Sequence, residues 1–325
     1  MEKIKWGVLG TANIAKNCTI PGMQLANSCE LYAVAGRSIE KATTFKNEFG
    51  FEKAYGSYEE LLDDPKVQAI YIPLPNNLHY EWVINALNKK KHVLCEKPLA
   101  LSEAEVVEMF DCAKANGVIL MEAYAYLHSP YIKSLIDDVK GGVIGEVNYI
   151  DTKFITQFYK EDIRLYKDMG GGAMYDLGCY CTSLILSLFD SKVSSVKAIA
   201  EFTDKGVDSL TTAIISFENG LKATIAAGMI LGEDTDERLD RLFIRGDKGR
   251  IISNVEFNQE GQVSYQIEGI SGLETKTINN PQNYSLEVEN LSQSILGIET
   301  PRISMDFSLK NASLIDTVLK EIGYK

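Results

Sequence analysis

Ile4-Lys-Trp-Gly-Val-Leu-Gly10-Thr-Ala12-Asn-Ile-Ala15 is the stretch of sequence that decides the fold. An apolar strand leads into Gly10, Ala12 and Ala15, which have the spacing of the G-x-G-x-x-G/A turn of dinucleotide-binding folds. There the first amides of a helix can bind a pyrophosphate. Ala12 replaces the second glycine, so we expect the pyrophosphate to be shifted slightly. The candidate phosphate-binding residues are Gly10, Thr11, Ala12, Asn13 and Ile14. The alternative is a glycine turn that only packs a helix on a sheet.

The first part of the chain alternates short apolar runs with amphipathic helical stretches, which is typical of βαβ units and a parallel sheet. Strands are expected at residues 4–9, 31–35, 69–72, 92–95 and 118–123. Ser57-Tyr-Glu-Glu60 and Ser102-Glu-Ala-Glu105 fit the capping box at helix starts, and Gly117 is expected to end the second of these helices. The pattern predicts an α/β Rossmann domain, with a doubly wound parallel sheet, over residues 1–123.

Beyond about residue 145 the pattern changes to longer alternating strands, expected at 193–202, 211–217 and 222–227. Asn219-Gly220 lies between the last two and supplies the positive torsions of a tight hairpin turn. Helical periodicity returns over 286–296 and 307–322. Residues 124–325 are therefore expected to form an α+β domain that binds substrate, with a C-terminal helix able to pack back on the first domain. A chain of 325 residues fits two domains.

Gly36-Arg37-Ser38 lies where an NAD-dependent enzyme would place an acidic residue against the ribose 2′-hydroxyl. Lys41 follows one turn into the next helix. Two cations and a hydroxyl suit a 2′-phosphate, because arginine can donate two charge-assisted hydrogen bonds to it. We therefore expect NADP as the cofactor, with NAD possible. The alternative is that Arg37 and Lys41 are solvated surface charges.

Two further strands end in polar segments, at the sheet edge where ligands bind in open α/β folds. The segment after the strand at 69–72 offers three cofactor-contact candidates, Pro73, Asn76 and His79. For His79, a structural role at a helix start is an equal alternative. The strand at 92–95 ends in Glu96 and Lys97, which are candidates for the same cofactor, and a lysine there can polarise a reacting oxygen.

Gly170-Gly-Gly172-Ala-Met-Tyr-Asp176-Leu-Gly-Cys-Tyr180 begins a helix with three glycines that allow close backbone approach. Asp176 and Tyr180 are four residues apart and share a helix face. Hydride transfer needs a group that takes a proton from the reacting hydroxyl. A phenol, with an ordinary pKa of about 10, can do so beside a cation. We expect Tyr180 to be this acid/base, assisted by Lys97 and oriented by Asp176. The alternative reading makes them a strand-end lysine, a helix-start charge and a core aromatic.

Weaker candidates for substrate contact follow the last parallel strand and precede the glycine run: Glu122, Tyr124, Tyr126, His128 and Arg164. Such groups could hydrogen-bond sugar hydroxyls, and we expect about half of them to be structural. The six cysteines include no C-x-x-C pair, and Cys179 and Cys181 have no partner ligands nearby in sequence. We expect no metal.

These motifs, in this order, resemble the glucose-fructose oxidoreductase, inositol dehydrogenase and MocA-type oxidoreductase family. Within it the chain looks most like the branch of dimeric dihydrodiol dehydrogenase and NADP-dependent xylose dehydrogenase, whose members have Tyr at the position of Tyr180. The resemblance implies catalytic roles for Lys97, Asp176 and Tyr180. It also implies a sugar, polyol or cyclic diol as substrate. The second domain would then be built on an open, mostly antiparallel sheet, through which a homodimer or homotetramer could form.

The formal net charge of −12 argues against general binding to nucleic acid or to anionic lipid. No secretion segment or run of about 18 apolar residues is seen, so we expect a cytoplasmic protein with reduced thiols. The rival hypothesis is an NADP-binding sensor or regulator on the same fold. Erosion of the Lys97 or Tyr180 positions would favour that rival, and both residues are present.

Overall fold

The computed structural model describes residues 2–232, 237–255, 257–270 and 272–325. The chain forms two compact units. The first contains residues 2–128 and Pro281–Leu309, and the second contains the described residues of Ser129–Asn280 together with Lys310–Lys325. We expected a boundary after residue 123 and a C-terminal helix able to pack back on the first domain; in the structure the first unit extends to His128 and also contains the returning segment Pro281–Leu309. That segment belongs to the first unit, where Gln282 Nε2 donates a hydrogen bond to the Cys18 carbonyl at 3.0 Å.

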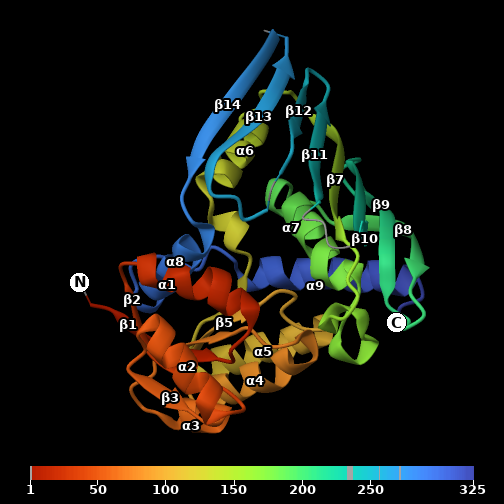
Figure 1. Cartoon of the computed structure of the whole chain (residues 1–325). Coiled ribbons are helices and arrows are strands. Elements are labelled where there is room, and N and C mark those ends of the chain that lie inside the picture. The colour runs from red at the N-terminus through yellow and green to blue at the C-terminus, as the bar shows by residue number, and fades with distance from the viewer. Residues whose placement is uncertain (1, 233–236, 256, 271) are drawn as a thin grey trace. The chain divides into compact units, whose positions relative to one another are not determined.

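The described residues of the first unit form a six-stranded parallel sheet in the order β3-β2-β1-β4-β5-β6. Figure 1 labels β1, β2, β3 and β5 of this sheet. The strands are β1 (Ile4–Leu9), β2 (Cys29–Ala35), β3 (Lys53–Tyr55), β4 (Ala69–Ile72), β5 (His92–Glu96) and β6 (Leu120–Ala123). The predicted parallel sheet is confirmed. Only β3 was not expected, because it has three half-buried residues and so lacks an apolar run.

Helices follow the strands of the first unit as the βαβ pattern predicts. They are η1 (Ala15–Thr19), α1 (Ile20–Leu25), α2 (Ile39–Phe49), α3 (Tyr58–Asp63), α4 (Asn76–Asn88), α5 (Glu103–Asn116), η2 (Ala125–His128) and α8 (Asn283–Ile295). Both predicted caps are confirmed, since Ser57 and Ser102 accept hydrogen bonds from the amides of Glu60 and Glu105. Gly117 ends α5 in the left-handed conformation.

The described residues of the second unit form an eight-stranded open sheet in the order β14-β13-β12-β11-β7-β10-β9-β8. The strands are β7 (Val147–Gln157), β8 (Val193–Phe202), β9 (Asp208–Phe217), β10 (Lys222–Leu231), β11 (Leu239–Gly246), β12 (Arg250–Ser253), β13 (Gly261–Gly269) and β14 (Gly272–Asn280). All neighbours are antiparallel except β7 and β10. The expected mostly antiparallel sheet and the hairpin at Asn219-Gly220 are therefore confirmed.

The remaining elements are α6 (Pro130–Lys140), η3 (Ile163–Leu165), η4 (Lys167–Met169), η5 (Met174–Gly178), α7 (Cys179–Leu188) and α9 (Met305–Glu321). Helix α7 is almost entirely buried and carries Tyr180. The boundary between the two units falls within α9. Among the residues that the structure describes, no helix combines the length and apolar character needed to cross a membrane.

Candidate functional site

The turn after β1 has the geometry that the glycine pattern predicts. Gly10 has φ +130°, and a Cβ at this position would lie 3.1 Å from Leu74 Cδ2. The helix that begins at Asn13 continues through the π-helical segment η1 into α1. Amides in the first turn of a helix have no partner within the helix, so the start of this helix can accept a phosphate group. Thr11, Ala12 and Ile14 are half-buried, and Asn13 is exposed.

Arg37, in the turn after β2, and Lys41, in the first turn of α2, are both exposed to solvent. The hydroxyl of Ser38 caps α2, because Ser38 Oγ accepts a hydrogen bond from the Lys41 amide and donates one to Glu40. Within the described parts of the chain, no ion pair is recorded for Arg37 or Lys41. Both cations can therefore turn toward a 2′-phosphate, whereas the Ser38 side chain already serves the helix.

The segment after β4 holds His79 inside the protein. The side chain is fully buried, with Nδ1 2.9 Å from the Pro98 carbonyl and Nε2 2.8 Å from the Leu74 carbonyl. Burial lowers the pKa of His79, and a neutral imidazole donates to one carbonyl at a time. Both ring nitrogens face backbone, which favours the structural alternative. Pro73 is also buried, while Asn76 begins α4 and is half-buried.

Lys97 follows β5 and lies in a turn that is held by a buried acid. Glu122, at 3% exposure, accepts hydrogen bonds from the Leu99 amide at 2.9 Å and from Ser308 Oγ at 2.7 Å. Burial raises the pKa of Glu122 to about 7, and the charge of Lys97 opposes this rise. Glu122 therefore positions the backbone two residues after Lys97. Lys97 itself is half-buried.

Glu96 is the first member of a polar cluster at the end of β5. Tyr71 Oη donates to Glu96 Oε1 at 2.6 Å, and Thr19 Oγ1 donates to Tyr71 Oη at 2.8 Å. Glu287 on α8 is 1% exposed, and its pKa is raised well above the usual range by burial and by the charge of Glu96. Thr19, Tyr71 and Glu287 were not among the residues predicted from the sequence. Glu287 could have been found from the sequence, because it is an acidic residue one turn before Leu291 on the apolar face of the expected helix.

Three weaker substrate candidates lie in the interior of the first unit. Tyr124 packs edge-on against Tyr126 and Phe307, with ring centroids 6.2 and 6.3 Å away. Both tyrosines are buried. His128 is also buried, and its pKa is lowered to about 4, first by burial and then by Arg302. The structure therefore gives these three residues packing contacts.

In the second unit, Asp176 forms an ion pair with another predicted site residue. Arg164 Nε donates to Asp176 Oδ2 at 2.6 Å, and Arg164 Nη1 donates to Asp162 Oδ1 at 3.0 Å. The two aspartates raise the pKa of the guanidinium, with Asp176 as the larger cause. Asp176 is thus held in place by Arg164, a pairing that the sequence analysis did not foresee.

Tyr180 is half-buried at the start of α7, among aromatic rings. Its ring centroid lies 5.4 Å from that of Phe154 and 5.1 Å from that of Phe257. Asn258 Nδ2 lies 3.5 Å from Tyr180 Oη, at the long limit of a hydrogen bond. The two phenylalanine rings hold the ring of Tyr180 in place, and its phenol oxygen is the polar end of this aromatic group. The preceding η5 is a short π-helical segment, a feature often seen at functional sites.

The three glycines before η5 permit the expected close approach. A Cβ on Gly171 would lie 2.3 Å from the Arg164 carbonyl oxygen, and one on Gly172 would lie 2.1 Å from Asp208 Oδ1. Asp208 Oδ2 accepts hydrogen bonds from the Met174 amide at 2.8 Å and from Thr211 Oγ1 at 2.6 Å. This buried carboxyl therefore caps the helix that carries Asp176. Burial raises the pKa of Asp208 to about 6.

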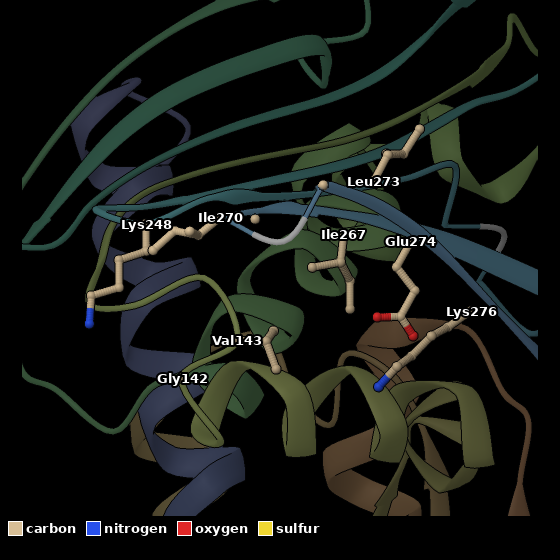
Figure 2. Close-up of a pocket in the computed structure, with 10 residues that line it drawn as sticks. Gly142, Val143, Lys248, Ile267, Ile270, Leu273, Glu274 and Lys276 are labelled. Carbon is tan, nitrogen blue, oxygen red and sulfur yellow. The ribbon is translucent and has the colours of Figure 1, made fainter.

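A separate pocket of about 540 Å³ lies beside the β13–β14 hairpin (Figure 2). Its lining residues are Gly142, Val143, Lys248, Ile267, Gly269, Ile270, Gly272, Leu273, Glu274 and Lys276. None of the predicted site residues lines it. Its Lys276 is already paired with Asp138, at 2.6 Å.

Two family models match the chain. Residues 4–124 match the GFO/IDH/MocA oxidoreductase family with an NAD-binding Rossmann fold. Residues 132–252 match the GFO/IDH/MocA C-terminal domain.

Similar proteins cover nearly the whole chain. The NADP⁺ D-xylose 1-dehydrogenase 2 of Haloferax volcanii is 32% identical over 96% of this chain and 95% of its own. The trans-1,2-dihydrobenzene-1,2-diol dehydrogenase of Xenopus laevis is 31% identical over 98% of each chain. A 3-ketoreductase from Actinomadura kijaniata, solved with NADP and TDP-benzene, superposes with a TM-score of 0.92 at 30% identity, covering 99% of this chain and 98% of its own. The chain therefore belongs to the GFO/IDH/MocA family, and it is an NAD(P)-dependent oxidoreductase.

Proposed function

We propose that this protein transfers hydride between NADP(H) and the carbinol or carbonyl carbon of a sugar, polyol or cyclic diol. The single observation that carries the proposal is the presence of Lys97, Asp176 and Tyr180 in a chain that keeps the phosphate turn at Gly10. The names of similar proteins support the substrate class, since they act on xylose, on a dihydrodiol and as a 3-ketoreductase.

The proposed chemistry assigns the proton to Tyr180. NADP, when bound, supplies the hydride chemistry at its nicotinamide ring. In the oxidative direction the phenolate of Tyr180 takes the hydroxyl proton of the substrate, and in the reductive direction the phenol returns it. The ammonium group of Lys97 favours the phenolate and stabilises negative charge on the substrate oxygen. Asp176, held by Arg164, orients a substrate hydroxyl.

An absorbance assay at 340 nm tests this proposal. NADP⁺ is offered with aldoses, polyols and cyclic diols, and NADPH with ketoses and dicarbonyls. The expected result is turnover by the wild-type protein and a kcat that is about 10²-fold or more lower in Lys97→Ala and in Tyr180→Phe. Near-normal kcat in Tyr180→Phe would remove the phenol from the acid/base role. Tight NADPH binding without turnover across the panel would favour the sensor.

The two residues lie in different units, so a double-mutant cycle tests whether they act in one step. Groups that act as a unit have non-additive effects on kcat, because removing one already removes the contribution of the other. We expect the kcat of the double variant Lys97→Ala with Tyr180→Phe to be only slightly lower than the kcat of the less active single variant. Fully multiplicative losses would show that the two side chains work independently.

The preference for NADP over NAD is assigned to Arg37 and Lys41. The exposure of both cations, on the turn after β2 and the first turn of α2, supports the assignment. Arg37→Ala should weaken NADPH binding by roughly 10- to 100-fold, the loss of a charge-assisted contact, and should leave NADH binding unchanged. Lys46→Ala is the matched control, because Lys46 lies in the last turn of α2, the helix that carries Lys41 in its first turn. Equal effects on both cofactors would refute this assignment.

We further propose self-association through the open sheet of the second unit. Ile199 on β8 and Ile214 on β9 are 76% and 55% exposed. Ile214 lies between the buried Ala213 and Ile215, and Ile199 lies between two half-buried alanines. Exposed apolar side chains gathered on one face are typical of an interface between protein chains. A homodimer or homotetramer would cover them.

A further inference from the structure

Helix α8 carries two buried oxygen atoms that have no hydrogen-bond partner among the described residues. They are Asn283 Oδ1 and Glu287 Oε1, on side chains that are 2% and 1% exposed. The two residues are four apart in one helix, so they share a face. A buried polar atom without a partner is destabilising, and natural proteins contain few of them. Two on the same helix face therefore indicate a bound group.

The surroundings of this face locate it at the ligand edge of the parallel sheet. Gln282, the cap of α8, donates from Nε2 to the carbonyl of Cys18 at 3.0 Å, and Cys18 precedes Thr19 in η1. The charge of Glu96, the last residue of β5, also raises the pKa of Glu287. Tyr71, on the neighbouring β4, donates to Glu96 at 2.6 Å and accepts from Thr19 at 2.8 Å. Thr19 belongs to η1, in the helix that follows the phosphate turn. These contacts are all within the first unit.

The topology of the sheet indicates which part of a dinucleotide reaches this edge. In a doubly wound sheet the ligand lies across the carboxyl ends of the strands, at the point where the strand order reverses. Here β1 has β2 on one side and β4 on the other. The adenosine half belongs on the β2 side, where Arg37 lies. The nicotinamide half of a bound dinucleotide would then extend over the ends of β4 and β5, beside Glu96.

We propose that Asn283 and Glu287 bind the carboxamide group of the nicotinamide ring. A primary amide has two N–H donors, and the helix face offers two acceptor oxygens that are otherwise unsatisfied. Both the neutral and the charged form of Glu287 keep an acceptor. The inference deepens the proposed function and rests on it only for the binding of NADP. Holding the carboxamide would fix which face of the ring is turned toward the substrate.

Calorimetric titration of the full chain with two cofactors tests the proposal. One is NADP⁺ and the other is its 3-acetylpyridine analogue, in which a methyl group replaces the carboxamide nitrogen. We expect the wild-type protein to bind the analogue roughly tenfold more weakly, the effect of lost hydrogen bonds. In Glu287→Leu and in Asn283→Ala, the affinities for NADP⁺ and for the analogue should become more nearly equal. Glu287→Gln keeps an acceptor and should preserve the difference.

Glu289→Gln is the matched control, because Glu289 lies on the same helix but accepts hydrogen bonds from Ser28 and Gln293. It should leave the ratio of the two affinities unchanged. Equal binding of both cofactors by the wild-type protein would overturn the proposal. So would an unchanged ratio in the variants, the result expected if the oxygens bind only water. If Glu287→Leu does not fold, Asn283→Ala decides.

The measurement uses no substrate, so a failure of the chemistry proposed for Tyr180 and Lys97 would not affect it. Should the protein prefer NAD⁺, the same titrations are made with NAD⁺ and its acetylpyridine analogue. A protein that binds neither dinucleotide would refute the proposed function and this inference together. Binding of NADP⁺ without discrimination would refute this inference alone.

Discussion

Replacing Glu122 with Gln should remove a pH dependence of stability from the first unit. The pKa of Glu122 is raised to about 7 in the folded protein, from an ordinary value near 4.5. The folded state therefore holds a proton that the unfolded state releases, and the carboxyl contributes stability that is present below about pH 4.5 and lost as the pH rises through 7. A shift of roughly 2.5 pH units corresponds to about 3 kcal/mol. Of this, roughly 2.5 kcal/mol should be lost between pH 5 and pH 8.

Urea unfolding followed by tryptophan fluorescence measures this difference selectively. Both tryptophans of the chain, Trp6 and Trp82, lie in the first unit with Glu122. The free energy of unfolding should fall between pH 5 and pH 8 by roughly 2.5 kcal/mol more in the wild type than in Glu122→Gln. All other titrating groups are common to the two proteins and cancel. If the two proteins lose the same free energy, Glu122 does not titrate in this range.

Three other changes have expected outcomes. Gly171→Ala would place a methyl group 2.3 Å from the Arg164 carbonyl oxygen, so we expect either a strongly reduced kcat or a lower melting temperature by calorimetry. A variant with the wild-type kcat and the wild-type melting temperature would contradict the close packing of this turn. Ser102→Ala removes the cap that accepts from the Glu105 amide and should lower the free energy of urea unfolding by about 1 kcal/mol, whereas an unchanged value would show that the cap contributes nothing. Ile214→Asp should yield monomers by sedimentation velocity at concentrations where the wild type associates, and persistent oligomers would exclude this sheet face as the interface.

The parallel sheet was predictable because its strands are buried on both faces. Such strands form continuous apolar runs, and β1 and β4 coincide with the predicted residues. Caps and turns were also predictable, since the Ser-x-x-Glu segments at Ser57 and Ser102 act within a few neighbouring residues. In contrast, β14 is mostly exposed on both faces, and its sequence has no apolar alternation to indicate a strand.

The candidate site was predictable only in part. The phosphate turn and the Arg37 segment depend on local spacing after a strand, and the sequence shows such spacing directly. The partners of these residues come from distant segments. Arg164 pairs with Asp176, and Glu122 holds the turn after Lys97 through the Leu99 amide. For His79 the sequence left two roles open, and its two carbonyl neighbours favour the structural one.

What the sequence determined by itself was most of the parallel strands, the β8–β10 strands and the chemical groups that follow the parallel strands, because hydrophobic periodicity and turn chemistry act over a few residues. What only the tertiary structure decided was which of these groups are buried, and with which partners. A segment more than 150 residues beyond the parallel strands returns to the first unit and brings Glu287 near Glu96. Desolvation and pairing arise from contacts between distant residues, and no local pattern in the sequence encodes such a contact.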